Sequence, residues 1–453
     1  MGVESESLDI ARRIVEMARS AGAEQCDALV RTYDESTVSV RLSEVERLIE
    51  ASSRAVGLRV INQKRTATCS TSDFSDASLR ELARNAVELA NISEPDEHAG
   101  LPDPAQFSRA TADALQLFDE RLQSLSVDEK KAMALACEGA AFATDSRISN
   151  SDGATFSSHW GRVALANSLG FGGQYAMTGV SLAVEVMADD SEGKKRNASW
   201  FSSERLLHRL LDPAEIGRIA AQRAVATIGA RKVETKRVPV VFEPLVAARL
   251  AGTIVGCATG SSLYRGATFL ASRKGDTIGS PLVTITDNPL LPARSGTRPF
   301  DGEGVAVSSR PIFDHGVFSA FLFDTYTGRQ TANPTTGSAH RGVESTPAPG
   351  PSNLIWEPGA VSAEQIIAGV ADGFYVTDLM GFGFNPATGD FSRGAAGFWI
   401  ENGEIAFPVT EVNISGRMDQ MLASVDAVGN DLTWFGSMAA PTIRLSEMMV
   451  SGL

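Results

Sequence analysis

The sequence contains little cysteine and little histidine for its length. Its 453 residues include five histidines and four cysteines, at positions 26, 69, 137 and 257. The cysteines are far apart and form no Cys-x-x-Cys pair, which favours single buried thiols in a reducing compartment over a disulfide framework. No two histidines form a His-Glu-x-x-His pattern, which would place two imidazoles and a general base on one helix. The sequence therefore shows no local metal motif of this kind.

Long apolar runs are also missing. No segment of the sequence is long and apolar enough to cross a lipid bilayer. The first residues, MGVESESLDIARR, are acidic and lead into an amphipathic helix, which is unlike a signal peptide. Together with the scattered thiols, these features predict a cytoplasmic protein without membrane contact.

The sequence has fewer basic than acidic residues, 41 Lys and Arg against 55 Asp and Glu, which gives a formal net charge of -14. An acidic surface repels phosphate groups, so binding of nucleic acid would need a local basic patch. The clearest basic cluster, Lys194 to Arg196, is short and lies next to Asp189, Asp190 and Glu192. It is interpreted as a solvated hairpin loop, and no nucleic-acid partner is expected.

Motifs for nucleophilic and phosphate chemistry are absent as well. The sequence has neither a Gly-x-Ser-x-Gly elbow nor a Gly-x-x-x-x-Gly-Lys phosphate loop. Asp301, Glu303 and Asp390 lie in turn contexts rich in glycine, where a carboxylate usually accepts hydrogen bonds from the backbone. These carboxylates are therefore expected to shape turns.

The N-terminal region, residues 1–230, predicts an α+β domain. A helix is expected over 7–22, followed by strand pairs at 28–32 with 37–42 and at 57–61 with 65–70. Asp34 and Glu35 should form the first turn. A second helix is expected over 77–91, with Asp76 as its cap. This order favours antiparallel sheets with flanking helices.

The same order of elements recurs before residue 230. Ser126 and Glu129 form a capping box for a helix to about residue 142, strands follow over 147–188, and a helix over 213–229 starts after Asp212. Residues 1–92 and 113–230 are therefore candidate similar sub-units of one domain. The charged stretch 231–237 is expected to be the junction with the next domain.

Residues 237–453 predict a large β-rich domain, either barrel-like or sandwich-like. Short runs of β-branched and aromatic residues alternate with Gly, Pro and Asp-Gly turns. Two helices are expected within it, over 244–257 and 361–370. The segment 330–352 is rich in Gly, Pro, Thr and Ser and should be a long loop, which in a compact domain is often functional.

A β-hairpin is the most specific local prediction in this domain. Asn402 and Gly403 supply the two positive φ angles of a type I′ turn between two runs of strand-forming residues. The hydrophobic alternation of the return strand changes parity between Val409 and Val412. A β-bulge near Thr410 would explain this change.

Three blocks of sequence carry a resemblance to a known family. They are GFNPATGDFSRGAAGFWIENGE from residue 383, TGSAHRG over 336–342 and RPFDGEGVA over 298–306. In content, order and spacing they resemble the TldD/PmbA family, peptidase family U62, formerly described as modulators of DNA gyrase. Within the family the chain is more similar to the PmbA/TldE branch than to the TldD branch. The resemblance implies a component of a metalloprotease that cleaves peptides or unfolded polypeptides.

The resemblance also shows where a metal motif would be expected in this chain. TldD-type chains carry a His-Glu-x-x-x-His motif on a helix, and the matching positions here are Ala251, Gly252 and Gly256. No histidine or acidic residue occurs over 244–260, so neither zinc ligands nor a general base are present there. No catalytic residue, metal or other cofactor is therefore expected in this chain, and zinc is expected in a TldD-type partner.

The resemblance implies a heterodimer with that partner, while a homodimer is the alternative pairing. Peptides are expected to bind as an added strand against a sheet edge. A partner-independent, chaperone-like homodimer that binds peptides is the main alternative function, and an independent hydrolase with an unidentified site is a third. Five residues in the matching blocks are candidates for binding substrate or partner, namely His340, Arg341, Phe384, Asn385 and Arg393.

Overall fold

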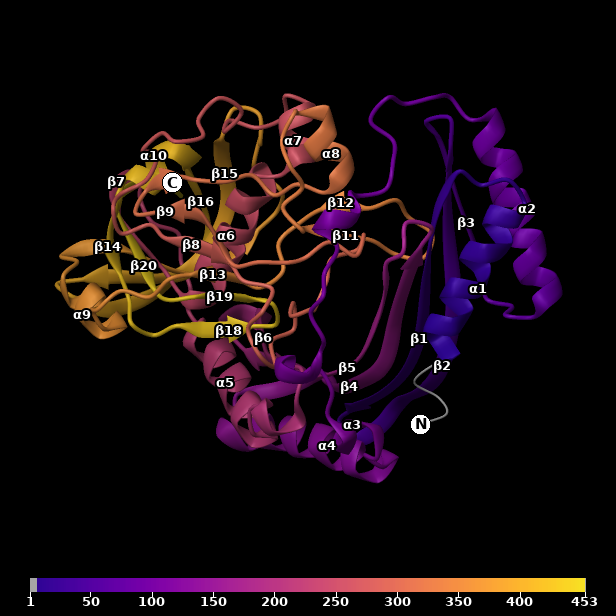
Figure 1. Cartoon of the computed structure of the whole chain (residues 1–453). Coiled ribbons are helices and arrows are strands. Elements are labelled where there is room, and N and C mark those ends of the chain that lie inside the picture. Colours follow the sequence, from indigo (N-terminus) through magenta and orange to yellow (C-terminus); the bar gives the residue numbers. More distant parts are fainter. Residues whose placement is uncertain (1–5, 453) are drawn as a thin grey trace.

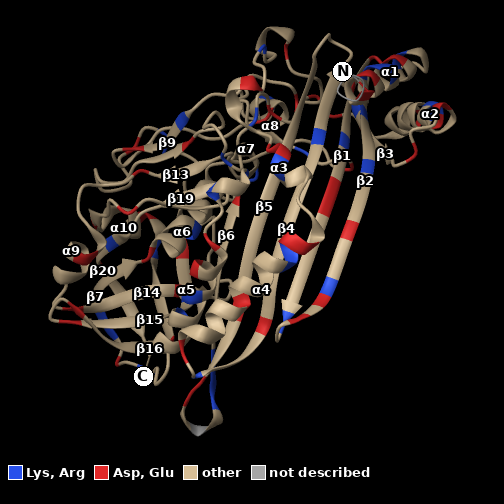
Figure 2. Ribbon diagram, turned by 90° about the horizontal axis from the view of Figure 1, so that it is seen from below, with Lys and Arg blue, Asp and Glu red and all other residues tan. Residues whose placement is uncertain are grey.

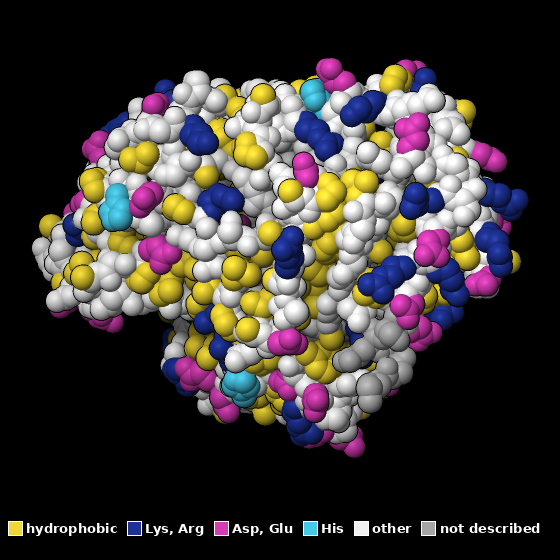
Figure 3. Space-filling view, in the orientation of Figure 1, with side chains coloured by type: hydrophobic (Ala, Val, Ile, Leu, Met, Phe, Trp, Pro, Cys, Tyr) yellow, Lys and Arg dark blue, Asp and Glu magenta, His cyan; other side chains and the backbone are white. Residues whose placement is uncertain are grey.

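The computed structural model describes residues 6–452. A long, twisted N-terminal sheet carries helices on its outer face, and its inner face packs against a β-rich C-terminal part (Figure 1). The fold is thus mixed α and β, as the sequence predicts. In Figure 3, hydrophobic side chains show through along the boundary between the two parts.

The N-terminal sheet has six antiparallel strands in the order β3-β2-β1-β4-β5-β6. Its centre is the pairing of β1 with β4, so each half of the N-terminal region contributes three adjacent strands. The strands are β1 (Gln25–Arg41), β2 (Glu44–Asn62), β3 (Arg65–Thr71), β4 (Ile148–Asn167), β5 (Gly172–Asp189) and β6 (Lys195–Glu204).

The turn predicted at Asp34 and Glu35 is wrong, and so is the strand pair predicted at 28–32 with 37–42, whereas the pair predicted at 57–61 with 65–70 is present between β2 and β3. Asp34 and Glu35 lie in the middle of β1, a continuous strand of 17 residues. Asp34 lies opposite Ser52 on β2 and opposite Trp160 on β4, and its carboxylate accepts a hydrogen bond from the Ser52 hydroxyl. Because β1 is hydrogen-bonded on both sides, the sheet overrides the poor strand propensity of Asp and Glu.

Four helices cover the outer face of this sheet. The first pair packs on β1 and β2, and the second pair packs on β4 and β5. Helix, three strands and helix therefore occur twice in succession. None of the helices in the described part of the chain is long and apolar enough to span a membrane. The four helices are α1 (Glu6–Ser20), α2 (Asp76–Ile92), α4 (Val127–Thr144) and α5 (Pro213–Ala226).

The helix starts follow local capping signals. Ser126 and Glu129 form the predicted capping box of α4, with both reciprocal hydrogen bonds present, and Asp212 caps α5. The cap of α2 differs by one residue from the prediction. Its N-cap is Ser75, whose hydroxyl accepts from the backbone N–H of Ser78, so Asp76 is the first helical residue.

The C-terminal part is built around a five-stranded barrel. One sheet has the order β16-β15-β14-β7-β20-β17, and the additional pairing of β16 with β20 closes it. This closure joins β16, at one rim of the sheet, to β20, next to the other rim, so the five barrel strands form a closed ring. The strands are β7 (Lys236–Phe242), β14 (Asp372–Met380), β15 (Asp390–Glu401), β16 (Glu404–Arg417), β17 (Val425–Val428) and β20 (Ile443–Ser451).

A second, more irregular sheet packs beside the barrel, with α6 (Pro244–Cys257) in the shared hydrophobic core. The segment 330–352 is mostly irregular, as predicted, and contains a two-stranded ribbon of β11 (Ala339–His340) and β12 (Ala348–Pro349). Helix α9 (Ala363–Ala368) falls within the range expected from sequence. The second sheet contains β10 (Val317–Phe318), β9 (Arg310–Asp314), β8 (Ile285–Asp287), β13 (Leu354–Trp356), β19 (Met438–Ala440) and β18 (Thr433–Phe435).

The predicted hairpin is present between β15 and β16. Asn402 and Gly403 have φ angles of 53° and 83°, as a type I′ turn requires. The predicted bulge is also confirmed. Ala395 pairs with Val412 but Gly397 pairs with Val409, so two residues of β16 are accommodated within the bulge, and this shifts the side-chain parity of the strand.

Gly403→Val should destabilise the C-terminal part by about 1 kcal/mol or more, because a β-branched residue is poor at positive φ. A Cβ atom at Gly403 would also lie 2.7 Å from the carbonyl oxygen of Ala368. Urea unfolding followed by circular dichroism measures the effect. Ala406→Val, at an exposed position of the same strand, is the matched control and should be nearly neutral. Equal unfolding midpoints for the two variants would contradict this account of the turn.

The inner face of the N-terminal sheet is set by strand alternation. Along β1, Ala28 and Val30 pack under the helices. Asp27 and Leu29, at alternate positions, contact the C-terminal part instead. Because side chains alternate between the two faces of a strand, Arg31 lies on this inner face as well. The charged and apolar groups that meet the C-terminal loops thus come from one row of β1.

Candidate functional site

Helix α6 carries Ala251, Gly252 and Gly256, the three positions that the sequence resemblance aligns with a metal motif. Ala251 is buried in the core with 1% of its surface exposed. A side chain at Gly252 would meet the sulfur of Met438, whereas Gly256 faces open space. Positions five residues apart differ by about 140° around a helix. In this chain the three positions therefore do not share one open face.

Cys257, the thiol nearest to these positions, is not suited to bind a metal. Its Sγ lies 3.7 Å from the carbonyl oxygen of Thr253, and burial raises the pKa of the thiol to about 12. Metals bind the thiolate form, which this environment disfavours. Among the described residues, no group of three or more His, Cys, Asp and Glu side chains is arranged to hold a metal ion. The residues on α6 therefore do not fit zinc.

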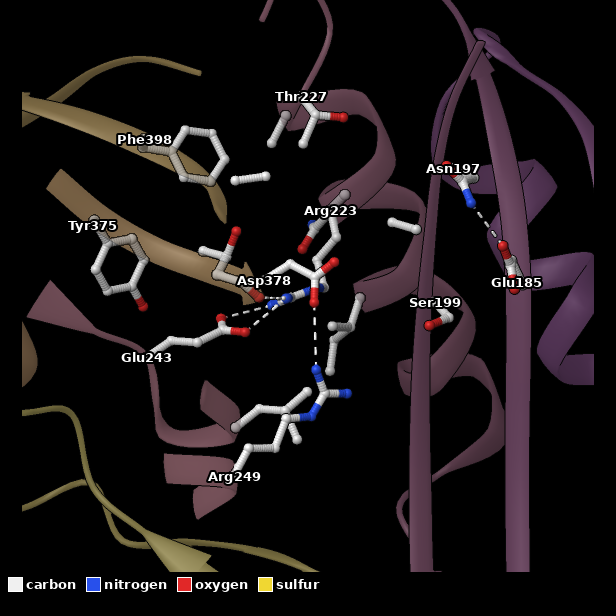
Figure 4. A pocket seen from close by; sticks show the side chains of 17 residues that line it. Glu185, Asn197, Ser199, Arg223, Thr227, Glu243, Arg249, Tyr375, Asp378 and Phe398 are labelled. Carbon is white, nitrogen blue, oxygen red and sulfur yellow. Dashed lines mark hydrogen bonds and ion pairs between the residues drawn. The ribbon is translucent and has the colours of Figure 1, made fainter. Parts of the chain in front are cut away.

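A cavity of about 490 Å³ lies beside the start of α6, between α5 and β6 on one side and β14 and β15 on the other (Figure 4). Arg223 from α5 forms a two-pronged ion pair with Glu243, with N to O distances of 2.7 and 2.8 Å. Burial raises the pKa of Glu243 although Arg223 opposes the shift. Arg249 pairs with Asp378 at 3.3 Å. These charges are paired within the protein, and the pair of Arg223 with Glu243 joins its two parts.

A second cavity, of about 430 Å³, lies between the inner face of the N-terminal sheet and the C-terminal loops. Its floor is apolar and comes from the sheet strands and Phe300. Its other walls are polar and come from the loops around residues 298–302 and 340–348. The lining residues are Leu29, Arg31, Val163, Leu165, Tyr175, Arg298, Phe300, Asp301, Gly302, His340, Arg341, Gly342, Ser345, Thr346 and Ala348.

His340 lies on the wall of this second cavity. It retains exposed surface, yet the surrounding protein disfavours a charged ring. Loss of hydration and the positive charge of Arg298 lower the pKa of His340 well below its ordinary value. The surroundings of His340 therefore favour the neutral form of its ring.

Arg341 belongs to a buried cluster of charges that crosses from one part of the protein to the other. Its Nη1 atom is 2.6 Å from Oδ1 of Asp27. Arg59, directly opposite Asp27 in the sheet, pairs with the second oxygen of Asp27 and lies 3.4 Å from Glu303. Burial alone would raise the pKa of Asp27, but Arg341 and Arg59 together lower it. The cluster fastens the C-terminal loops to the sheet.

The loop after Arg341 rests directly on the sheet at Gly57. A Cβ atom on Gly57 would lie only 1.9 Å from the carbonyl oxygen of Val343, so only glycine allows the backbone of the loop to approach this closely. Arg31 also holds the loop, since its Nη2 atom donates to the carbonyl oxygen of Arg341 at 3.0 Å. The wall of the second cavity is thus positioned by β1 and β2.

Comparison with known proteins assigns the family. Three consecutive segments match family domains: residues 26–90 match PmbA/TldA metallopeptidase domain 1, residues 120–228 the central domain, and residues 235–452 the C-terminal domain. Metalloprotease PmbA of Escherichia coli O157:H7 is 34% identical over 92% of this chain and 90% of that protein. The chain belongs to the PmbA/TldD metallopeptidase family.

A second relative agrees with this assignment, and two solved structures share the fold. A metalloprotease PmbA homologue of Haemophilus influenzae is 32% identical over 97% of this chain and 94% of that protein. The crystal structure of a proposed modulator of DNA gyrase from Bacteroides thetaiotaomicron superposes with a TM-score of 0.92 at 29% identity, covering 99% of both chains. TldE of Thermococcus kodakarensis shares the fold, with a TM-score of 0.88 at 22% identity over 97% of this chain and 99% of that chain.

The candidate residues from the family blocks fall into two places. His340 and Arg341 line the second cavity, whereas Phe384, Asn385 and Arg393 lie in and after the loop between β14 and β15 and do not line it.

In that loop, Phe384 packs against the core of the C-terminal part. The side-chain oxygen of Asn385 accepts from the N–H of Ala387 at 3.1 Å, which shapes the turn. Arg393 approaches the carbonyl oxygen of Leu379 at 3.5 Å. The roles predicted for these residues in binding remain predictions.

Sequence reasoning missed most of the second cavity. The position of Arg31 follows from the alternation in QCDALVR, where Asp27, Leu29 and Arg31 share the face of the strand opposite to Ala28 and Val30. Arg298 lies in a block that was recognised, but nothing in its local sequence indicates burial. Its environment depends on contacts with Ala339, 41 residues away.

Proposed function

We propose that this chain is the TldE-type, zinc-free subunit of a cytoplasmic TldD/TldE metalloprotease that cleaves peptides or unfolded polypeptides. The observation that carries the proposal is helix α6, where Ala251, Gly252 and Gly256 replace the family's ligands and base. In the complex, zinc bound by the TldD-type partner supplies a Lewis acid and an activated water. This chain supplies binding surface and encloses the substrate.

One edge of the N-terminal sheet is open for an added strand. β3 covers β2 along Val56–Asn62, and residues 44–54 of β2 are almost all exposed on both faces of the sheet. Leu48 has 52% of its surface exposed. Acidic and basic residues are both found along this strand (Figure 2). Such an edge can add a strand from a partner or from an extended peptide. Pairing of this edge with its own copy would form the homodimer.

The direct experiment is a three-way assay. Peptide hydrolysis is measured for this chain alone, for a TldD-type partner alone and for the mixture, with complex formation followed by size-exclusion chromatography. We expect this chain alone to be inactive and the mixture to exceed the partner. A mixture no faster than the partner, together with tight peptide binding by this chain alone, would replace the proposal with the chaperone-like alternative.

Metal analysis gives a separate prediction. The purified chain should hold far less than one zinc per chain after mild chelation, since α6 presents no imidazole, carboxylate or thiolate. The TldD-type partner, treated in the same way, is the positive control. Stoichiometric zinc that survives dialysis and is held by three or more ligands of this chain would contradict the prediction.

A further inference from the structure

The second cavity combines a positively charged wall with an apolar floor. Arg31, Arg298 and Arg341 line it together with one carboxylate, Asp301. The oxygens of Asp301 already accept hydrogen bonds from the backbone N–H groups of three residues. These donors are Glu303 and Val305 at 2.9 Å and Ala339 at 3.0 Å.

The buried arginines of this wall carry N–H groups that make no hydrogen bond among the described residues. Arg298 is 8% exposed and Arg341 6% exposed. Nη1 of Arg298 donates to the carbonyl oxygen of Ala339 at 2.9 Å. Nε and Nη2 of both arginines are shielded from solvent and have no hydrogen-bond partner among the described residues. A guanidinium group removed from water and left with free donors favours an acceptor beside it, above all a charged one.

The apolar floor restricts what that acceptor is attached to. Leu29, Val163 and Leu165 come from neighbouring strands of the sheet, and Phe300 closes the floor from the C-terminal side. Phe300 is fixed by edge contacts to Phe171 and Tyr175, with ring centroids 5.2 and 5.4 Å away. A ligand that satisfies both walls carries an anionic group next to an apolar group.

We propose that this cavity binds the C-terminal carboxylate of a peptide whose last side chain is apolar. The carboxylate offers two oxygens to Nε and Nη2 of Arg298, in the paired geometry that arginine favours, and the side chain lies on the apolar floor. Arg31, at the exposed rim, adds a further positive charge, whereas the charge of Arg341 is already paired with Asp27. The proposal deepens the proposed function, because it names the end of the peptide that this chain holds.

The test measures binding to the full chain alone, without partner or metal. A fluorescent, N-terminally blocked peptide that ends in leucine is compared with the same peptide amidated at its C-terminus. The free carboxylate should bind about tenfold or more tightly than the amide, as expected for a charge-assisted hydrogen-bond pair. Equal affinities of the two peptides would overturn the proposal, and so would displacement of the peptide by inorganic phosphate at the concentrations at which the peptide itself binds.

Three variants locate the site. Arg298→Gln and Arg31→Gln should each weaken binding of the carboxylate peptide and leave binding of the amide unchanged. Ala348→Glu, at an exposed position of the cavity lining, places a competing carboxylate at the rim without removing any contact. Ala348→Glu should also weaken binding, and it provides the test if Arg298→Gln fails to fold. Arg249→Gln, an exposed arginine of the first cavity, is the matched control. Native affinity in folded Arg31→Gln and Ala348→Glu would overturn the assignment to this cavity.

The outcome is independent of the proposed protease role. If the carboxylate preference is found but the mixture with a TldD-type partner cleaves nothing, the cavity stands and the proposed function fails. If the mixture cleaves peptides and this chain shows no preference for a free carboxylate, the proposed function stands and the assignment of the cavity fails.

Discussion

Asp27→Ala is expected to lower the free energy of unfolding by about 3–5 kcal/mol, the usual cost of removing one partner from a buried ion pair. Asp27 is 2% exposed and lies between Arg59 and Arg341. Without its carboxylate, Arg341 keeps no ion-pair partner among the described residues, and Arg59 keeps only Glu303 at 3.4 Å. The measurement is urea unfolding followed by circular dichroism.

The matched control is Asp76→Ala. Asp76 also pairs with two arginines, Arg13 at 3.2 Å and Arg80 at 3.5 Å, but its side chain is 55% exposed. Exposed ion pairs contribute about 0–1 kcal/mol, so this variant should stay close to the native stability. Similar unfolding midpoints for Asp27→Ala and Asp76→Ala would contradict the buried cluster.

A double variant tests whether the cost comes from an unpaired charge. Asp27→Ala combined with Arg341→Leu removes both members of one pair, so less uncompensated charge remains buried. We expect the double variant to be more stable than the sum of the two single effects predicts, with a coupling of about 0.5–3 kcal/mol. Additive single effects would show that the two side chains do not interact.

The features that were predicted correctly from sequence are those with local causes. The capping box of α4 depends on Ser126 and Glu129, three residues apart, and the type I′ turn depends on Asn402 and Gly403, which are adjacent. Helix α6 has the bounds expected from sequence, because an apolar run follows Pro244 at its first position. In each case, neighbouring residues decide the conformation.

The features that were missed depend on contacts between distant residues. β1 continues through Asp34 because β2 and β4 pair with it on both sides, which no property of residues 34 and 35 indicates. The ion pair of Asp27 with Arg341 joins positions 314 residues apart. Such pairings require the fold to be known, so sequence indicated His340 and Arg341 as candidates but not the cavity around them.

The second large effect concerns which subunit of the proposed complex carries the catalytic groups. Replacing the motif histidines of the TldD-type partner should reduce peptide cleavage by the mixture to background, because zinc and its activated water are lost together. Variants of this chain at the exposed sheet edge, such as Leu48→Lys, should act differently. They should lower the rate only as far as they weaken assembly, and a higher subunit concentration should restore it by mass action.

The rate of peptide cleavage by this native chain mixed with a TldD-type partner whose motif histidines are alanine tests the central claim most directly. Size-exclusion chromatography must show that the complex still assembles, and the same mixture with native partner sets the reference rate. The prediction is cleavage no faster than background, because this chain offers neither zinc ligands nor a base at Ala251, Gly252 and Gly256. Cleavage close to the reference rate would contradict it and would show that this chain carries catalytic groups of its own.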